Sequence, residues 1–198
     1  MYVEVLDNFL SENQLSKIDN ELSNITWPKL FQRAGSHMYE NTDMENLPVM
    51  REMYNVFSTP TFLKQLEDKI GIKGIVPDPH LVGAGYSEIK NHGDLKPHID
   101  FNWNDTIKMY RVASLIIYLS DDYEGGELWF EDREPIQTKR NRALIFGHSE
   151  TIRHQVMPVK GVRKNLRFFY YASKLNPPLG YHRSLYGFKD GKAIDVKD

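Results

Sequence analysis

Apolar residues recur at helical spacing in the first third of the sequence. They lie every three or four positions after Ser11, at Leu15, Ile18 and Leu22. Ser11 and Gln14 have the spacing of a capping box, in which each side chain hydrogen-bonds the other residue's backbone N–H. These features predict a helix over about residues 11–22.

Two further helices are expected before residue 75. One begins at Thr59-Pro60 and ends at Gly71, and its apolar face is formed by Phe62, Leu63, Leu66 and Ile70. A less regular pattern indicates another helix over 48–57, and a short strand is expected over residues 2–6. Such helices need a partner surface on which to bury their apolar faces.

From about residue 76 the pattern changes to short β-branched and aromatic runs separated by turn residues. These runs cover residues 112–119, 127–130, 143–146, 152–157 and 166–172. This spacing predicts a β-sandwich or barrel. The run over 112–119 is apolar on both alternating faces, so we expect a central strand covered on each side, by the helices and by a second sheet.

Composition limits the possible partners and metal ligands. The 198 residues suit one domain, and the balance of 25 basic against 27 acidic residues does not favour nucleic acid as a partner. Neither a membrane span nor a signal peptide is recognisable, so we expect no membrane association and a cytoplasmic location. The sequence has no cysteine. Any metal must therefore be bound by nitrogen and oxygen ligands.

Histidine and aspartate occur at a spacing that suits a metal site. His98 and Asp100 are two positions apart, so on a strand their side chains point to the same face. A facial triad needs a third ligand from another strand, and His148, His154 and His182 are the later candidates. His154 is the best placed, because it lies in a strand-like run nine residues before Arg163. Two adjacent antiparallel strands would bring His154 and Arg163 into one cavity.

The order of these features resembles a known family. The stretches that carry the resemblance are 96–102, 117–120, Gly125-Gly126-Glu127-Leu128, Asn141 to Phe146 and His154 to Arg163. Over residues 81–173 this order is similar to that of the prolyl 4-hydroxylase-like branch of the iron(II)/2-oxoglutarate oxygenases. The resemblance implies a mostly β fold with N-terminal helices. In it, a double-stranded β-helix, or jelly roll, over about 76–175 follows a helical support over 1–75.

The resemblance also implies a cofactor set and a role for each site residue. His98, Asp100 and His154 would bind Fe(II), and 2-oxoglutarate and O2 would complete the reaction, with ascorbate as reductant. Arg163 would pair with the distal carboxylate of 2-oxoglutarate, and Lys164 is its rival because some relatives carry lysine one position later. Tyr118 would add a hydrogen bond to that carboxylate, and Tyr86 would line the same pocket.

The substrate is left open by the sequence. Peptidyl proline is slightly favoured over a free amino acid, a sugar or another small molecule, and a non-catalytic binding module of the same fold is the remaining alternative. Residues 30–50 and the tail over 176–198 are expected to cover the entrance. Trp103 and Trp129 fit either the rim of the site or the core. The remaining histidines, His37, His80 and His92, are expected at the surface.

Overall fold

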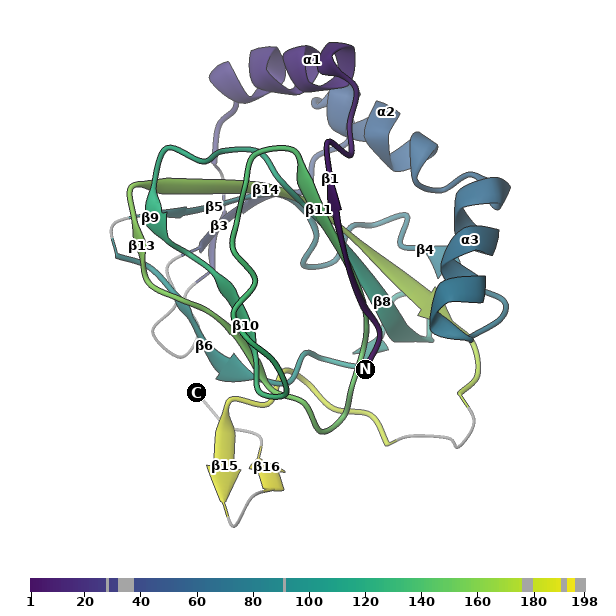
Figure 1. The fold of residues 1–198 in the computed structure, drawn as a ribbon. Helices are drawn as coiled ribbons and strands as arrows, with labels where there is room; N and C mark the ends of the chain where they lie inside the picture. Colours follow the sequence, from purple (N-terminus) through teal and green to yellow (C-terminus); the bar gives the residue numbers. More distant parts are fainter. Residues whose placement is uncertain (28, 32–37, 91, 176–179, 190–191, 195–198) are drawn as a thin grey trace.

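The computed structural model describes residues 1–27, 29–31, 38–90, 92–175, 180–189 and 192–194. Two β-sheets face each other, and three helices cover the outer side of the larger one (Figure 1). The predicted fold class, a jelly roll with N-terminal helices packed on its larger sheet, is confirmed. Within the described residues, no helix is long and apolar enough to cross a membrane.

The helices form where the sequence predicts them. They are α1 (Glu12–Ser23), α2 (Pro48–Val56) and α3 (Pro60–Ile70). Ser11 caps α1 through the expected capping box with Gln14. Thr59 caps α3, and Gly71 ends it with a left-handed backbone (φ 75°) that glycine adopts without strain.

The larger sheet carries β8 near its centre. Its strand order is β1 (Val3–Asp7), β11 (Arg142–Gly147), β8 (Met109–Tyr118), β14 (Val162–Ala172), β5 (Gly85–Lys90), β3 (Met38–Asn41) and β2 (Lys29–Phe31). Two short strands join it, β4 (Val76–Pro77) to β14 and β7 (Trp103–Asn104) to β8. As predicted from its apolar faces, β8 is covered on both sides.

The smaller sheet carries the two histidines of the predicted metal site. It consists of β10 (Leu128–Phe130), β12 (His154–Val156) and β6 (Leu95–His98). Two further pairs are β9 (Glu124–Gly125) with β13 (Val159–Lys160), and β15 (Gly187–Lys189) with β16 (Lys192–Ile194). The expectation that His154 and Arg163 lie on adjacent strands is wrong, because β12 belongs to this sheet and β14 to the larger one.

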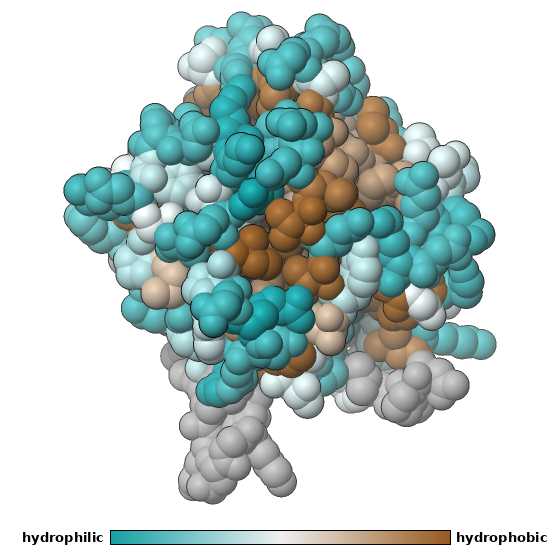
Figure 2. Space-filling view, viewed as in Figure 1, coloured by the Kyte–Doolittle hydropathy of each residue, from teal (hydrophilic) through white to brown (hydrophobic). Residues whose placement is uncertain are grey.

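Each face of the larger sheet has its own hydrophobic cluster. Leu115 and Ile117 of β8 pack with the helices, whereas Tyr118 packs with Leu144 and Phe146 between the two sheets. Figure 2 shows that apolar side chains also reach the surface on the face that carries β1. Because side chains alternate along a strand, the parity of a residue decides which cluster it joins.

Candidate metal centre and substrate cavity

The smaller sheet brings His98 and His154 together. The two residues are register partners on the antiparallel strands β6 and β12, and their ring centroids lie 4.2 Å apart. Asp100 follows β6, with Oδ1 3.4 Å from Nε2 of His98 and Oδ2 3.4 Å from Nε2 of His154. One ligand atom from each residue can be chosen so that all three lie within 4.8 Å of one another. This is a compact set of two imidazole nitrogens and one carboxylate oxygen.

The hydrogen bonds and pKa shifts of this cluster favour the protonation states that bind metals. Nδ1 of His98 donates to the carbonyl of Lys96 at 2.7 Å, which leaves Nε2 as the unprotonated nitrogen facing Asp100. Burial lowers the pKa of His154, and the neighbouring His98 lowers it further. Burial alone would raise the pKa of Asp100, but Arg111 and His154 hold it well below its usual value. A neutral imidazole therefore faces an ionised carboxylate.

Arg111 contacts this carboxylate and was not anticipated from the sequence. Its guanidinium lies 3.1 Å from Oδ2 of Asp100 and is 3.3 Å from the ring centroid of Phe169 and 4.7 Å from that of Phe101. It also donates to Oγ of Ser114 at 2.9 Å. The sequence does carry one signal for this contact. Arg111 directly precedes the apolar run over 112–119, and a charged residue at such a position is buried only with a partner.

His148 lies behind Asp100 rather than in the three-residue cluster. Its Nε2 is 3.0 Å from Oγ of Ser114 and 3.9 Å from Oδ2 of Asp100, and its ring stacks on Phe146. Burial lowers the pKa of His148 well below its usual value, and Arg111 adds to that effect. The geometry therefore favours His154 over His148 as the third ligand.

Arg163 and Tyr118 lie together between the two sheets. The guanidinium carbon of Arg163 is 5.1 Å from the ring centroid of Tyr118, and both side chains are almost fully buried. Among the described residues, Nε of Arg163 and the hydroxyls of Tyr118 and Tyr123 have no hydrogen-bond partner. Lys164 is partly exposed, as the alternation along β14 predicts. Buried donors without partners are unusual and call for an explanation.

Tyr86 is placed away from this group. It belongs to the cluster beneath the helices, and its hydroxyl donates to Glu21 of α1 at 3.0 Å. The expectation that Tyr86 lines the co-substrate pocket is therefore wrong, because its position on β5 turns it to the opposite face of the sheet from Tyr118. The sequence could not fix this parity, since the segment between Tyr86 and His98 has an irregular length.

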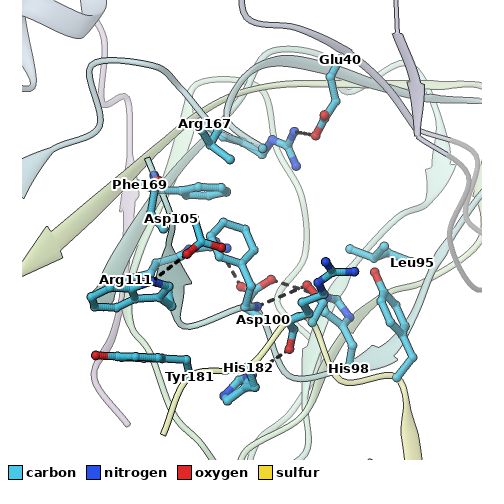
Figure 3. Close-up of a pocket in the computed structure, with 18 of the residues that line it drawn as sticks. Glu40, Leu95, His98, Asp100, Asp105, Arg111, Arg167, Phe169, Tyr181 and His182 are labelled. Carbon is cyan, nitrogen blue, oxygen red and sulfur yellow. Dashed lines mark hydrogen bonds and ion pairs between the residues drawn. The ribbon is translucent and has the colours of Figure 1, made fainter. Parts of the chain in front are cut away.

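A cavity of about 900 Å³ lies beside the cluster. Figure 3 shows Asp100 and His98 on one side of it, with Arg167 and Glu40 on another. Residues from both expected lids line it, Met38 and Glu40 from the first, and Tyr181, His182, Arg183, Ser184 and Tyr186 from the tail. Trp103 lines it as well. His37 lies outside the described residues, while His80 and His92 are exposed as expected.

The described tail is held against the segment that carries Asp100. Ile99 and Leu185 exchange two backbone hydrogen bonds, at 3.0 and 2.8 Å. The ring of Tyr186 stacks on that of His98 with centroids 5.0 Å apart. The tail therefore forms one wall of the cavity beside the cluster.

Part of the sequence matches the model of a known protein family. Residues 84–171 match the model of the 2OG-Fe(II) oxygenase superfamily. This segment, which is less than half of the 198 residues, is similar to that superfamily. The match includes His98, Asp100, His154, Tyr118 and Arg163, whereas the helices and the described tail lie outside it.

Solved structures with the same fold include three prolyl hydroxylases. The viral collagen prolyl hydroxylase vCPH from Paramecium Bursaria Chlorella virus-1, in its 2OG complex, superposes with a TM-score of 0.58 at 19% identity, over 87% of this chain and 97% of that one. A Trichoplax adhaerens prolyl hydroxylase in complex with a hypoxia inducible factor peptide fragment gives 0.63 at 15%, over 85% and 83%. A Pseudomonas putida prolyl-4-hydroxylase gives 0.63 at 11%, over 86% and 92%.

Among curated proteins the comparison finds no match. The structural likenesses are below 20% identity, so they establish the shared jelly-roll fold. The match of residues 84–171 to the 2OG-Fe(II) oxygenase model supports a dioxygenase, and the name of that family implies Fe(II) and 2-oxoglutarate.

Proposed function

We propose that the protein is an Fe(II)- and 2-oxoglutarate-dependent hydroxylase of a C–H bond. The cluster of His98, Asp100 and His154 at the edge of the cavity is the observation that carries this proposal. Two imidazoles and one carboxylate on one side of a metal are the ligand set of non-haem Fe(II) oxygenases, which leaves positions open for other ligands. The neutral His154 and ionised Asp100 support the same assignment.

Arg163 and Tyr118 are proposed to hold the distal carboxylate of 2-oxoglutarate. A carboxylate accepts hydrogen bonds from several donors, and the guanidinium can pair with it through two parallel N–H bonds. The donors of Arg163, Tyr118 and Tyr123 that have no protein partner within the described residues are suited to such a ligand. None of these three residues lines the 900 Å³ cavity, which leaves that space for the substrate.

The bound iron and 2-oxoglutarate would supply an oxidation in which substrate C–H, O2 and 2-oxoglutarate yield substrate C–OH, succinate and CO2. The protein's own residues bind and orient. Arg111 keeps Asp100 ionised, the Lys96 carbonyl fixes the tautomer of His98, and the tail residue Tyr186 packs over His98. Ascorbate is proposed as the reductant that keeps the iron in its Fe(II) state.

The proposal extends to the class of substrate. Peptidyl proline is supported by the structural relatives, which are prolyl hydroxylases. A small molecule is supported by the charged side chains in the wall of the cavity, among them Glu40 and Arg167. A non-catalytic binding role is less well supported, because a complete ligand set and Arg163 occur together.

A product screen tests this function. The purified protein would be incubated with Fe(II), 2-oxoglutarate and ascorbate, together with prolyl peptides or small molecules, and products analysed by mass spectrometry. We expect a gain of about 16 Da in one substrate class, matched by succinate. Asp100→Ala serves as the inactive control. The absence of succinate under every condition, even from slow turnover without substrate, would contradict the proposal.

A further inference from the structure

A buried ion pair lies in the cavity wall away from the metal-type cluster. Arg167 on β14 and Glu40 on β3 form it, with NH2 of Arg167 2.7 Å from Oε1 of Glu40. Only 9% of Arg167 and 3% of Glu40 is exposed. Figure 3 shows the pair across the pocket from His98 and Asp100.

Arg167 has more hydrogen-bonding capacity than the described residues use. A guanidinium has five N–H donors. For Arg167, Nε has no partner among the described residues, and NH1 faces the sulfur of Met38, which is a weak acceptor. Burying two charges costs desolvation energy that their mutual attraction repays only with good geometry and further hydrogen bonds. A charged ligand in the cavity would bond the spare donors of Arg167.

The opposite part of the cavity is aromatic. Trp103 and Tyr181 stack with centroids 4.1 Å apart and planes at 27°, and Tyr110 packs edge-on against Trp103 at 5.0 Å. Figure 3 shows Tyr181 on the far side of the pocket from Glu40 and Arg167, with Phe169 and Arg111 along the wall between them. The cavity therefore has one part with the buried ion pair and another with stacked aromatic rings, where Asp105 and Lys108 also line it beside Trp103, and the cluster with Asp100 borders the space they share.

We propose that Arg167 and Glu40 form the substrate-recognition site for a free α-amino acid with a large apolar side chain. Arg167 would pair with its carboxylate and Glu40 with its ammonium group, while the apolar group extends toward Trp103 and Tyr181. A zwitterion has no net charge, so it can insert beside both partners of the pair without unbalancing the cavity. An internal peptide residue has neither charge and would leave the spare donors of Arg167 unused.

This inference rests on the proposed function and concerns which C–H bond is presented to the reacting centre. The reaction would be the same: a C–H bond in the apolar group of the amino acid reacts with O2 to give C–OH, as 2-oxoglutarate becomes succinate and CO2. Failure of the function would abolish succinate formation altogether. Failure of the inference would leave succinate formation intact but independent of the amino acid's charged groups.

The first test changes the substrate and leaves the protein intact. Leucine, methionine, phenylalanine and proline would each be supplied as the free amino acid, the carboxamide and the N-acetyl derivative, and both the succinate rate and the hydroxylated product measured. We expect free acids to be used and each modified form to raise KM about ten-fold or more, because each lacks one charge-assisted contact. Hydroxylation of a prolyl peptide with no response to any free amino acid overturns the inference.

The second test changes the protein. Arg167→Met and Glu40→Gln are expected to raise KM for the amino acid about ten-fold or more while leaving the apparent constant for 2-oxoglutarate and slow substrate-free turnover little changed. Arg167→Lys should recover part of the loss, since the charge returns without the planar fork. The matched controls are Arg140→Met and Asp19→Asn, which break an ion pair between α1 and the loop before β11, outside the cavity lining.

The same variants separate the other roles that Arg167 can have. A rise in the 2-oxoglutarate constant with an unchanged amino acid KM would make Arg167 a co-substrate anchor and overturn the proposal. Losses of thermal stability and of kcat, with KM unchanged for every ligand, would make the pair a structural link between β3 and β14 and would also overturn it. The substrate series on the unaltered protein decides the question even if a variant does not fold.

Discussion

The guanidinium of Arg111 lies 3.1 Å from Oδ2 of Asp100 and packs against the rings of Phe101 and Phe169. It keeps the carboxylate charged in a buried site, because burial alone would raise the pKa of Asp100. The relationship links β8 of the larger sheet to the predicted metal ligand that follows β6 of the smaller one. It therefore makes Arg111 a positioning residue for the cluster.

Arg111→Met is expected to weaken Fe(II) binding. Without the guanidinium the pKa of Asp100 rises, so a proton competes with the metal and the carboxylate loses its fixed orientation. Loss of such a partner of a metal ligand costs about 10- to 100-fold in metal affinity. Anaerobic titration with Fe(II) measures the effect, and Arg111→Lys should recover part of it. Tighter binding in Arg111→Met would show that charge repulsion between Arg111 and the metal outweighs this positioning.

Arg163→Ala is expected to impair the use of 2-oxoglutarate. It removes a charge-assisted contact worth roughly 1.5–3 kcal/mol, which corresponds to at least about a ten-fold rise in the apparent 2-oxoglutarate constant. Arg163→Lys should recover part of the loss, and Tyr118→Phe should cost about 0.5–1.5 kcal/mol. The measurement is succinate formation against 2-oxoglutarate concentration. Lys164→Ala is the neighbouring control, and a larger effect there than in Arg163→Ala would make Lys164 the anchor.

Gly126→Ala should displace the side chain of Arg163, although Arg163 itself is unchanged. A Cβ at Gly126 would lie 2.9 Å from Cδ of Arg163 and 3.0 Å from the ring of Tyr123. Gly74→Ala is a matched control, since both glycines have nearly the same positive φ (73° and 72°) but nothing lies within 4 Å of a Cβ at Gly74. Both variants should lose stability through backbone strain. Only Gly126→Ala should also raise the apparent constant for 2-oxoglutarate. Equal constants in the two variants would show that a Cβ at Gly126 does not displace Arg163.

The attachment of the tail should weaken as the pH rises. His182 contacts Glu150 at 2.7 Å, and its Nδ1 donates to the carbonyl of Arg183. Burial alone would lower the pKa of His182, but these contacts raise it above its ordinary value of 6.5. The stabilisation of the attached tail by His182 is therefore fully present below pH 6.5 and is lost as the pH rises through the raised pKa of His182.

Hydrogen exchange at the tail measures this effect. The amides of His182 and Leu185 are bonded to Asn102 and Ile99, so their protection factors report whether the tail is attached. Protection should be higher at about pH 6 than at about pH 8, and His182→Gln should remove the difference. A pH-dependent difference that persists in His182→Gln would assign it to another group.

The regular parts of the fold were predictable because they depend on local patterns. The Ser11 capping box, the left-handed Gly71 and the apolar strand around Leu115 each carry their structural signal within a few residues. The shared orientation of His98 and Asp100 was predictable for the same reason, since side chains two positions apart on a strand point to the same face.

The remaining features depend on contacts between distant segments. Whether Tyr86 faces the helices or the second sheet depends on the register of β5, and a shift of one residue reverses it. The pairing of Glu40 with Arg167 joins residues 127 positions apart. The contact of Tyr186 with His98 depends on the path of the tail. No periodicity in the sequence reports such long-range contacts.

The most direct test of the account is the Fe(II) content of the protein and of four single variants, measured by anaerobic equilibrium binding with metal analysis. We expect about one Fe(II) for each unaltered protein molecule, strong loss in His98→Ala, Asp100→Ala and His154→Ala, and retained binding in His148→Ala. Circular dichroism would verify that each variant keeps its fold. Retained binding in His154→Ala together with loss in His148→Ala would contradict the proposed ligand set, and no binding to the unaltered protein would contradict the metal centre itself.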